Sequence, residues 1–360
     1  MELPILAEKI RALIKWGGYS LLGLFFVWLI WIVLSFFFRI IFPLGPEEAD
    51  QAFGKLPRPF QTVNTTNKLL ELDLQTPGGE FPANPTFLPV FAIPALEGKF
   101  TSLENGSEIA RNGGLDSNPI KLNEPVWLWN NSKNPNRSLK LNIVTNNFVY
   151  AYDWVADPES LLGVFKTTDS EIAGQARNFL GSFKSLKDEF KEGKTKVSFW
   201  KLEGSTRNRV GSFSEANAVL VEFFRKDISF KGKNYALVEP NTNLSSVNIL
   251  ISPAGKLEKR LLELNFTYWG VDFNNFGTYN LKTAEAAYAD LKEGKSHVAT
   301  DNARKFKTVV ILKIYLAYLS PIKETRFLQP VYVFEGEGQN GPEKEKFVAY
   351  VSAISPEFQK

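Results

Sequence analysis

The pattern of apolar and polar positions is dominated by one uncharged stretch of 23 residues, Trp16–Phe38. At about 1.5 Å of rise per residue, a helix of this length spans roughly 35 Å, which exceeds the hydrocarbon core of a bilayer at roughly 30 Å. Only a helix lets a lone segment satisfy its backbone hydrogen bonds in lipid. The pattern therefore predicts a transmembrane helix that meets the lipid bilayer through Trp16–Phe38. A buried core helix is the alternative.

The charges on either side of this stretch predict its orientation. Lys9, Arg11 and Lys15 precede it, whereas acidic residues follow it at positions 47, 48 and 50. Positive charge stays on the cytoplasmic side. Residues 1–15 are therefore expected to form a cytoplasmic tail and residues 16–42 a single-pass signal anchor, with an extracytoplasmic body. A cleaved signal peptide is the alternative, but its apolar core is shorter and ends at a small-residue cleavage site, which Phe36–Arg39 does not offer.

Two segments with different residue patterns follow the anchor. Residues 43–61 are rich in proline and charge, which predicts a semi-extended stalk. Between residues 62 and 154, apolar and polar positions alternate, as in Leu70–Gln75, and this period of two is typical of strands. We expect an N-terminal β-rich α+β unit there, with a short helix at Glu108–Asn112 that stops at Gly113.

The segment Asp169–Glu192 has the clearest pattern of a soluble helix. Its apolar residues recur at spacings of three and four, which places them in one stripe along a helix. Thr168 followed by Glu171 fits a capping box. Gly193 fits the left-handed position that commonly ends a helix.

A second, shorter helix is expected over Ala284–Glu293, because Thr283 can cap its start and Gly294 can end it. Most of the remaining apolar segments have strand-like patterns. The expected strands are Val126–Trp129, Leu139–Tyr152, Val197–Leu202, Ala218–Phe224, Tyr235–Val238, Val247–Ile251, Leu261–Tyr268, Val309–Leu319, Val331–Phe334 and Phe347–Ile354.

Part of the pattern repeats along the chain. Phe190–Val197 (FKEGKTKV) matches Leu291–Val298 (LKEGKSHV), and AVLVEFF from Ala218 parallels VVILKIY from Val309. A repeat of this size indicates duplicated domains and not a solenoid. We expect repeat domain 1 at residues 155–256 and repeat domain 2 at residues 257–360; chance similarity is the alternative. The predicted fold class is α+β, with an N-terminal single transmembrane helix followed by tandem antiparallel-sheet domains, each packed by one helix.

The C-terminal elements carry a resemblance to a known family. Tyr288–Gly294 ends a helix, and Val309–Leu319, Leu328–Phe334 and Phe347–Ala353 follow as strands. In element order over roughly residues 139–356, the chain resembles the YycH and YycI envelope proteins, with PepSY-like repeat units. The resemblance implies a non-enzymatic regulator that contacts a membrane sensor kinase through its transmembrane and extracytoplasmic parts. It implies no catalytic residue.

Composition limits the possible chemistry. The chain has no cysteine, which excludes disulfides and thiolate metal sites, and its single histidine, His297, is expected at the surface. With 42 Lys and Arg against 39 Asp and Glu, the charge is too balanced for a nucleic-acid-binding protein. Adjacent carboxylates such as Asp188 and Glu189 are expected to be solvated. No cofactor or metal is expected, and the sequence singles out no catalytic or partner-binding residue.

Several short motifs resemble functional sites but lack the required context. Gly193–Thr195 and Gly294–Ser296 end helices, whereas a phosphate loop opens one, so we expect no nucleotide. Ser198–Lys201 has the spacing of penicillin-recognising enzymes but lies in an expected strand. Asp272–Thr283 lacks two ligands of a calcium loop, so Asp272–Gly277 is expected to form a turn. Tryptophans alternate within the expected strands and are assigned to the core, with a carbohydrate or peptide groove as the alternative: Trp127, Trp129, Trp154, Trp200 and Trp269.

These observations favour a membrane-anchored, extracytoplasmic binding or regulatory protein of the bacterial cell envelope. It is expected to be non-enzymatic and to act through contacts with an envelope or membrane protein. Two alternatives stay open. One is a carboxylate-dependent envelope hydrolase, which would need a cleft with two carboxyl groups about 5–10 Å apart and one raised pKa. The other is a structural or assembly subunit of an envelope complex.

Overall fold

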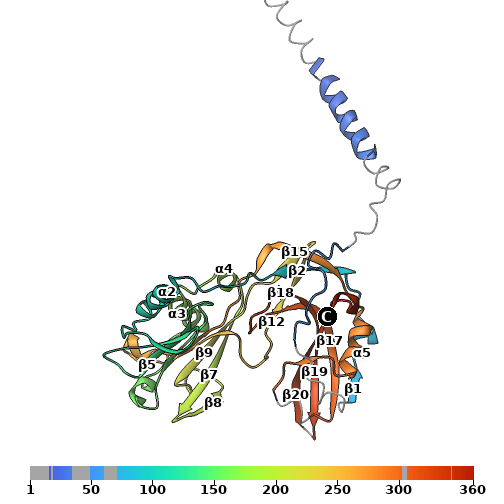
Figure 1. The fold of residues 1–360 in the computed structure, drawn as a ribbon. Helices are drawn as coiled ribbons and strands as arrows, with labels where there is room; N and C mark the ends of the chain where they lie inside the picture. Colours follow the sequence, from blue (N-terminus) through green and yellow to red (C-terminus); the bar gives the residue numbers. More distant parts are fainter. Residues whose placement is uncertain (1–15, 18, 35–48, 61–70, 302–305, 342) are drawn as a thin grey trace, which may run out of the picture. The chain divides into compact units, whose positions relative to one another are not determined.

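A computed structural model describes residues 16–17, 19–34, 49–60, 71–301, 306–341 and 343–360 (Figure 1). The chain divides into two compact units, Met1–Ala49 and Asp50–Lys360. The elements discussed below belong to the second unit, which we call the body, except for the helix near the N-terminus.

In the N-terminal unit, residues 16–17 and 19–34 are helical and their side chains are exposed. No helix within the described ranges has the length and hydropathy that a membrane span requires. Residues 18 and 35–42 of the expected span lie outside those ranges, as does the expected tail at 1–15. The structure therefore gives no support to the transmembrane helix of the expected fold class.

The body is a mixed α+β structure with several sheets and few helices, as the sequence predicts. Its largest sheet has nine strands, all paired antiparallel, in the order β3-β4-β5-β6-β14-β13-β9-β7-β8. These strands are β3 (Ile120–Asn123), β4 (Val126–Asn130), β5 (Arg137–Asn142), β6 (Phe148–Tyr152), β7 (Thr195–Glu203), β8 (Thr206–Val210), β9 (Ala218–Phe223), β13 (Val247–Ile251) and β14 (Leu261–Phe266).

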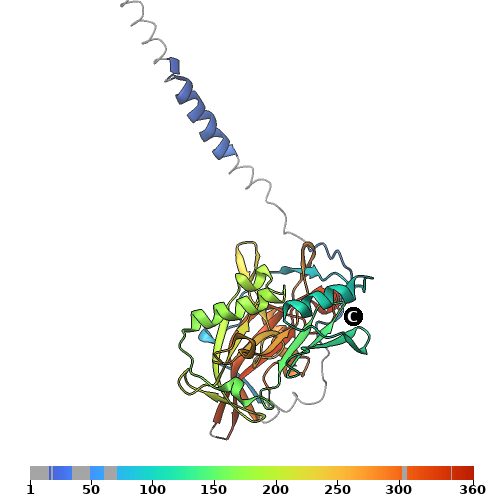
Figure 2. The ribbon, with the colours of Figure 1, turned by 90° about the vertical axis from the view of Figure 1, so that its left-hand side faces the viewer.

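Two helices, α2 (Ser102–Asn112) and α3 (Asp169–Ser182), cover this sheet. Figure 2 shows α2 in teal and α3 in green lying over it. Both helices bury residues in the same hydrophobic core as the central strands, among them Ala110 from α2 and Ile172, Ala176 and Leu180 from α3. Apolar burial of this kind stabilises a helix more than its intrinsic propensity does.

The expected helix at Asp169–Glu192 is two helices in the structure. α3 ends at Ser182, and the four-residue helix α4 (Asp188–Lys191) follows. The break occurs because Lys184 adopts a left-handed conformation with φ of 56°, while Ser185 N–H donates to Leu180 O at 2.9 Å, which is the hydrogen-bond pattern that terminates helices. Phe183 then turns into the core and stacks on Phe148 at 5.2 Å between ring centroids.

The capping box at the start of α3 is confirmed. Glu171 N–H donates to Thr168 Oγ1 at 3.3 Å, and Thr168 N–H donates to Glu171 Oε2 at 2.9 Å. These reciprocal bonds satisfy two backbone donors that the helix itself leaves free. The cap of the second helix, α5 (Ala284–Lys292), is also confirmed, because Thr283 Oγ1 accepts from Ala286 N–H.

Replacing Thr168 by alanine is expected to lower the free energy of unfolding by about 1 kcal/mol, because the Glu171 N–H loses its acceptor. Urea denaturation followed by tryptophan fluorescence measures this change. Thr167→Ala is the matched control, since the Thr167 hydroxyl donates to the Glu171 side chain and to Thr168 O but accepts from no backbone N–H of the helix. Equal losses in both variants would contradict the capping role.

The second large sheet has six strands. Five run in the order β1-β17-β19-β20-β16, and β12 pairs with the end of β17. β1 and β12 pair parallel to β17, while the other pairs are antiparallel. Helix α5 packs on it and buries Ala287, Tyr288 and Leu291. The strands are β1 (Glu71–Leu74), β12 (Leu237–Val238), β16 (His297–Val298), β17 (Thr308–Leu319), β19 (Pro330–Asn340) and β20 (Glu343–Ser352).

Two small sheets complete the body. One has the order β15-β2-β18, with β2 (Phe87–Ala92), β15 (Asp272–Asn280) and β18 (Phe327–Leu328). The other is the hairpin of β10 (Ile228–Phe230) and β11 (Lys233–Tyr235). The Tyr318 hydroxyl donates to Pro89 O at 2.8 Å, which joins the end of β17 to β2.

Part of the expected stalk is packed into the body. Residue Leu56 is fully buried with Val90, Tyr279 and Ile354, and its N–H donates to Phe358 O at 2.8 Å. Residues 50–60 are therefore not a spacer, because their apolar side chains and backbone groups find partners near the C-terminus. Residues 43–48 and 61 of the expected stalk lie outside the described ranges.

The sheets do not follow the expected domain limits at residues 154 and 256. The nine-stranded sheet takes strands from all three expected ranges, because β14 lies between β6 and β13. The repeated segments also differ in their pairing. β7 pairs with β9, whereas its counterpart β16 pairs with β20 and not with β17. The shared helix–glycine–strand order is thus built into two differently connected sheets.

Candidate functional site

A cavity of about 520 Å³ opens where the N-terminal segment of the body meets the loop between β17 and β19. We call it the proline pocket, because four prolines are among its lining residues. The lining comprises Pro57–Phe60, Pro240, His297, Leu319–Phe327 and Gln329. Four segments that are distant in sequence therefore contribute to one site.

Hydrogen bonds between these segments fix the shape of the proline pocket. The buried Gln329 donates from Nε2 to Pro57 O at 2.8 Å, which holds the N-terminal segment against the loop. Ser320 N–H donates to Val238 O at 2.9 Å and continues the parallel pairing of β12 with β17. On the far side of the loop, Ile93 N–H donates to Arg326 O at 2.8 Å.

His297 forms an aromatic wall of the pocket. Its ring lies between Phe60 and Tyr350, with centroid distances of 5.8 and 6.0 Å. Its Nε2 lies 2.7 Å from Pro240 O, and a carbonyl can only accept, so Nε2 carries the proton. The expected surface position of His297 is met in part, because the ring lines an open cavity but is half-buried between two aromatic side chains.

The charges at the pocket are predominantly positive. Arg58, Lys323 and Arg326 line it and are exposed. None of the three has an ion-pair partner among the residues that the structure describes, and the only carboxylate in the lining is Glu324. In addition, Oε1 of Gln329 is buried without a hydrogen-bond donor. A ligand with carboxylates would match the three exposed cations.

A second cavity, of about 570 Å³, lies beside the helices on the nine-stranded sheet. Arg137 and Arg260 line it together with side-chain amides such as Asn178. Both arginines already bind backbone carbonyls, since Arg137 Nη2 donates to Gly113 O at 2.7 Å and Arg260 Nε to Ala254 O at 2.7 Å. Their main contribution is thus to fix loops, and we favour the proline pocket as the candidate site.

A buried polar cluster lies where α4 meets the segments that follow β9 and β14. Arg225, with 3% of its side chain exposed, pairs through Nε with Glu189, which is 14% exposed. The Tyr268 hydroxyl donates to the other Glu189 oxygen at 2.9 Å, and Arg225 lies over the Tyr268 ring. Burial first, and the Glu189 charge second, raise the pKa of Tyr268 to about 12.

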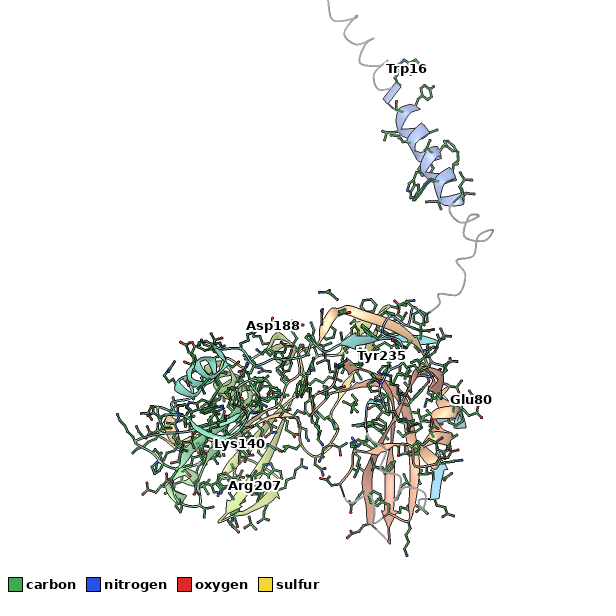
Figure 3. The ribbon with its side chains drawn as sticks, in the orientation of Figure 1. Trp16, Glu80, Lys140, Asp188, Arg207 and Tyr235 are labelled. Atoms are coloured by element: carbon green, nitrogen blue, oxygen red, sulfur yellow. The ribbon has the colours of Figure 1, made fainter. Side chains whose placement is uncertain are left out.

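This cluster corrects the expectation that Asp188 and Glu189 are both solvated. Asp188 is exposed and pairs with Lys191 at 2.7 Å (Figure 3). Glu189, in contrast, is held by Arg225 and Tyr268 inside the body. No local pattern distinguishes the two carboxylates, because the partners of Glu189 lie 36 and 79 residues away in sequence.

The cavities of the described residues differ in the carboxylates that line them, which are the groups that a hydrolase of the expected kind would need. The proline pocket contributes only Glu324 and the second cavity only Glu258. A shallow cavity on the β19–β20 hairpin gathers Glu335, Glu337 and Glu345 beside two lysines. The carboxyl with a pKa raised by burial, Glu239, lines none of these cavities and binds Ser246.

Two of the other sequence motifs lie in strands. Ser198–Lys201 is part of strand β7, as expected, whereas Asp272–Gly277 lies in strand β15 and not in the expected turn. Gly294 follows α5 with φ of 76°. Trp129 and Trp269 are buried, while Trp127, Trp154 and Trp200 pack partly buried against the core. Across the described ranges, no group of three or more metal-ligating side chains is close enough to hold a metal ion.

Comparison with known proteins adds little about function. No protein-family model matches the chain, and no curated protein matches it. The chain is similar to a solved structure of an uncharacterized protein from Eubacterium rectale ATCC 33656, with 13% identity over 78% of this chain and 86% of that chain. The TM-score of 0.40 is too low to support an argument from that structure.

Proposed function

We propose that this chain is a non-enzymatic binding protein of the cell envelope, anchored through Trp16–Phe38 with its body outside the cytoplasm. Its proline pocket binds an acidic peptide segment of a membrane or envelope protein. The uncharged stretch and the positive charge that precedes it support the anchor and its orientation. Regulation of a membrane sensor kinase, as the resemblance to YycH and YycI implies, is one use of such binding.

The binding proposal rests on the charged side chains of the proline pocket. The lining holds three cations, Arg58, Lys323 and Arg326, without an ion-pair partner among the described residues, and one carboxylate. Carboxylates of an acidic peptide would pair with these cations. The proline and aromatic walls supply apolar contact for the peptide's other side chains.

The proposal also accounts for the position of His297. Its Nε2 proton is committed to Pro240 O, and no hydrogen bond joins its ring to Ser320 or Glu324 within the described part of the chain. The imidazole therefore shapes the wall of the pocket, and the pocket presents no paired base and nucleophile of the kind that acyl transfer uses.

A peptide-binding measurement on the full chain in detergent tests the proposal. We expect a dye-labelled peptide of alternating Glu and Ala to bind, and the same peptide with Gln in place of Glu to bind more weakly. Fluorescence anisotropy measures both affinities. Arg58→Gln and Arg326→Gln should each lower the affinity about fivefold, which corresponds to about 1 kcal/mol. Raising the salt concentration should weaken binding in parallel.

Arg209→Gln is the matched control, because Arg209 is an exposed arginine of β8 that lines none of the cavities above. If Arg209→Gln lowers the affinity as much as Arg326→Gln does, binding is general electrostatics and the pocket assignment fails. The orientation is tested separately, since protease added to intact cells should digest the body. Protection of the body in intact cells would overturn the extracytoplasmic location.

A further inference from the structure

Two exposed phenylalanines lie on strand β15. Phe273 and Phe276 have exposed fractions of 38% and 43%. Both rings pack against the buried Phe91 of β2, with centroid distances of 5.3 and 5.8 Å. The two side chains therefore form one fixed apolar surface on the small sheet, and contiguous exposed apolar surface of this kind marks interaction sites.

Two further segments present apolar and basic side chains together. The segment between β2 and α2 is exposed from residue 94 to residue 100 and includes Leu96, Lys99 and the fully exposed Phe100. The turn of the β10–β11 hairpin exposes Lys231 and Lys233. The Lys231 ammonium lies 4.4 Å from the centroid of the Phe87 ring.

These three segments lie on one side of the body. Figure 2 shows the yellow β10–β11 hairpin and the orange loop that leads into β15 projecting from the same side. The connection from β2 to α2 runs along this side as well (Figure 1). We call this side of the body the aromatic rim. The exposed apolar and basic residues of its three segments are Leu96, Lys99, Phe100, Lys231, Lys233, Phe273 and Phe276.

The start of the body is fixed to the aromatic rim. Asp50 N–H donates to Thr278 Oγ1 at 3.0 Å, and Thr278 N–H donates to Asp50 Oδ1 at 2.8 Å. Thr278 follows Phe276 by two residues on β15. Eleven residues separate Asp50 from Phe38, the end of the uncharged stretch. Fully extended, they span at most about 40 Å.

We propose that the aromatic rim contacts the surface of the lipid bilayer in which Trp16–Phe38 is anchored. This inference rests on the proposed anchor. The connection to the anchor leaves the body at Asp50, which is bound to β15, and exposed Phe and Leu side chains would enter the boundary between headgroups and acyl chains. The lysines beside them place ammonium groups among lipid phosphates while their stems remain in apolar surroundings. The bilayer contact fixes the distance and orientation of the body relative to the membrane.

Single-cysteine labelling tests the proposal directly, because the chain has no native cysteine. The full-length variants Phe100→Cys and Phe273→Cys are labelled with an environment-sensitive dye and reconstituted in vesicles of phosphatidylcholine and phosphatidylglycerol. Leu312→Cys is the matched control, since Leu312 is 39% exposed. It lies six residues before Tyr318, about 20 Å along β17 from β2.

We expect blue-shifted dye emission and quenching by headgroup-spin-labelled lipid at positions 100 and 273, and neither effect at position 312. Flotation of the chain with the vesicles is measured on the same samples. Failure to float overturns the anchor and with it the proposed function. Flotation with identical emission at all three positions, or with quenching confined to position 312, leaves the anchor intact and overturns the membrane contact of the aromatic rim.

Discussion

Replacing Arg225 by methionine is expected to lower the free energy of unfolding by about 3–5 kcal/mol. The variant removes the cation that neutralises Glu189 inside the body, together with the bond from Arg225 Nη1 to Trp269 O at 3.3 Å. Glu189 then keeps only the Tyr268 hydroxyl, and a buried carboxylate without a counter-charge carries a large desolvation cost. Urea denaturation of the full chain, followed by tryptophan fluorescence, measures the loss.

The neighbouring ion pair provides the control for Arg225. Lys226 pairs with Glu192 at 3.0 Å, and both side chains are about half exposed, so Lys226→Met should change stability by less than about 1 kcal/mol. The double variant Glu189→Gln/Arg225→Met should recover most of the loss, because no unpaired charge remains. If the double variant is less stable than Arg225→Met alone, the charge imbalance is not the cause.

Replacing Gly193 by alanine is expected to cost about 3 kcal/mol of folding stability, the upper part of the range for overpacking. The sequence predicts a left-handed conformation for Gly193 at the end of a helix. This prediction is wrong, because the φ of Gly193 lies outside the left-handed region. A Cβ at this position would instead lie 1.9 Å from Phe224 O and 2.8 Å from Glu189 O. Glycine is required because two backbone carbonyls approach it closely.

Gly294 is the matched control for Gly193. It holds the equivalent position in the repeated segment, but its φ is 76°, so alanine there carries a conformational cost of about 1–2 kcal/mol. Denaturation midpoints of the two variants distinguish the two causes. A smaller loss for Gly193→Ala than for Gly294→Ala would show that the backbone of residues 189–193 relaxes, and would contradict the close approach.

The features that could be predicted from sequence are those set by neighbours along the chain. The capping box of Thr168 and Glu171 depends on two residues three positions apart. The strand pattern of β17 likewise follows from the run of β-branched, aromatic and other apolar residues within Thr308–Leu319. The α+β class rests on such local patterns, and for this reason it is confirmed.

Features set by distant partners could not be predicted. Strands β6 and β14 come from two expected domains but pair with each other, with Phe148 opposite Phe266. Burial of both sheet faces decides which strands meet, and this burial depends on residues that are far apart in sequence. The end of α3 at Lys184 was also missed, since a lysine gives no signal for a left-handed conformation. The proline pocket depends on four separate segments, so the sequence offered no motif for it.

The place of β14 in the nine-stranded sheet also determines how the body can be divided experimentally. A fragment that ends at residue 256 lacks β14, so β6 and β13 would each lose a neighbour along their full length. Two unpaired strand edges in the middle of an apolar core favour pairing with other molecules. Crystallisation or expression trials should therefore keep residues 50–360 together, because cutting at the apparent repeat boundary would yield an aggregating product instead of a domain.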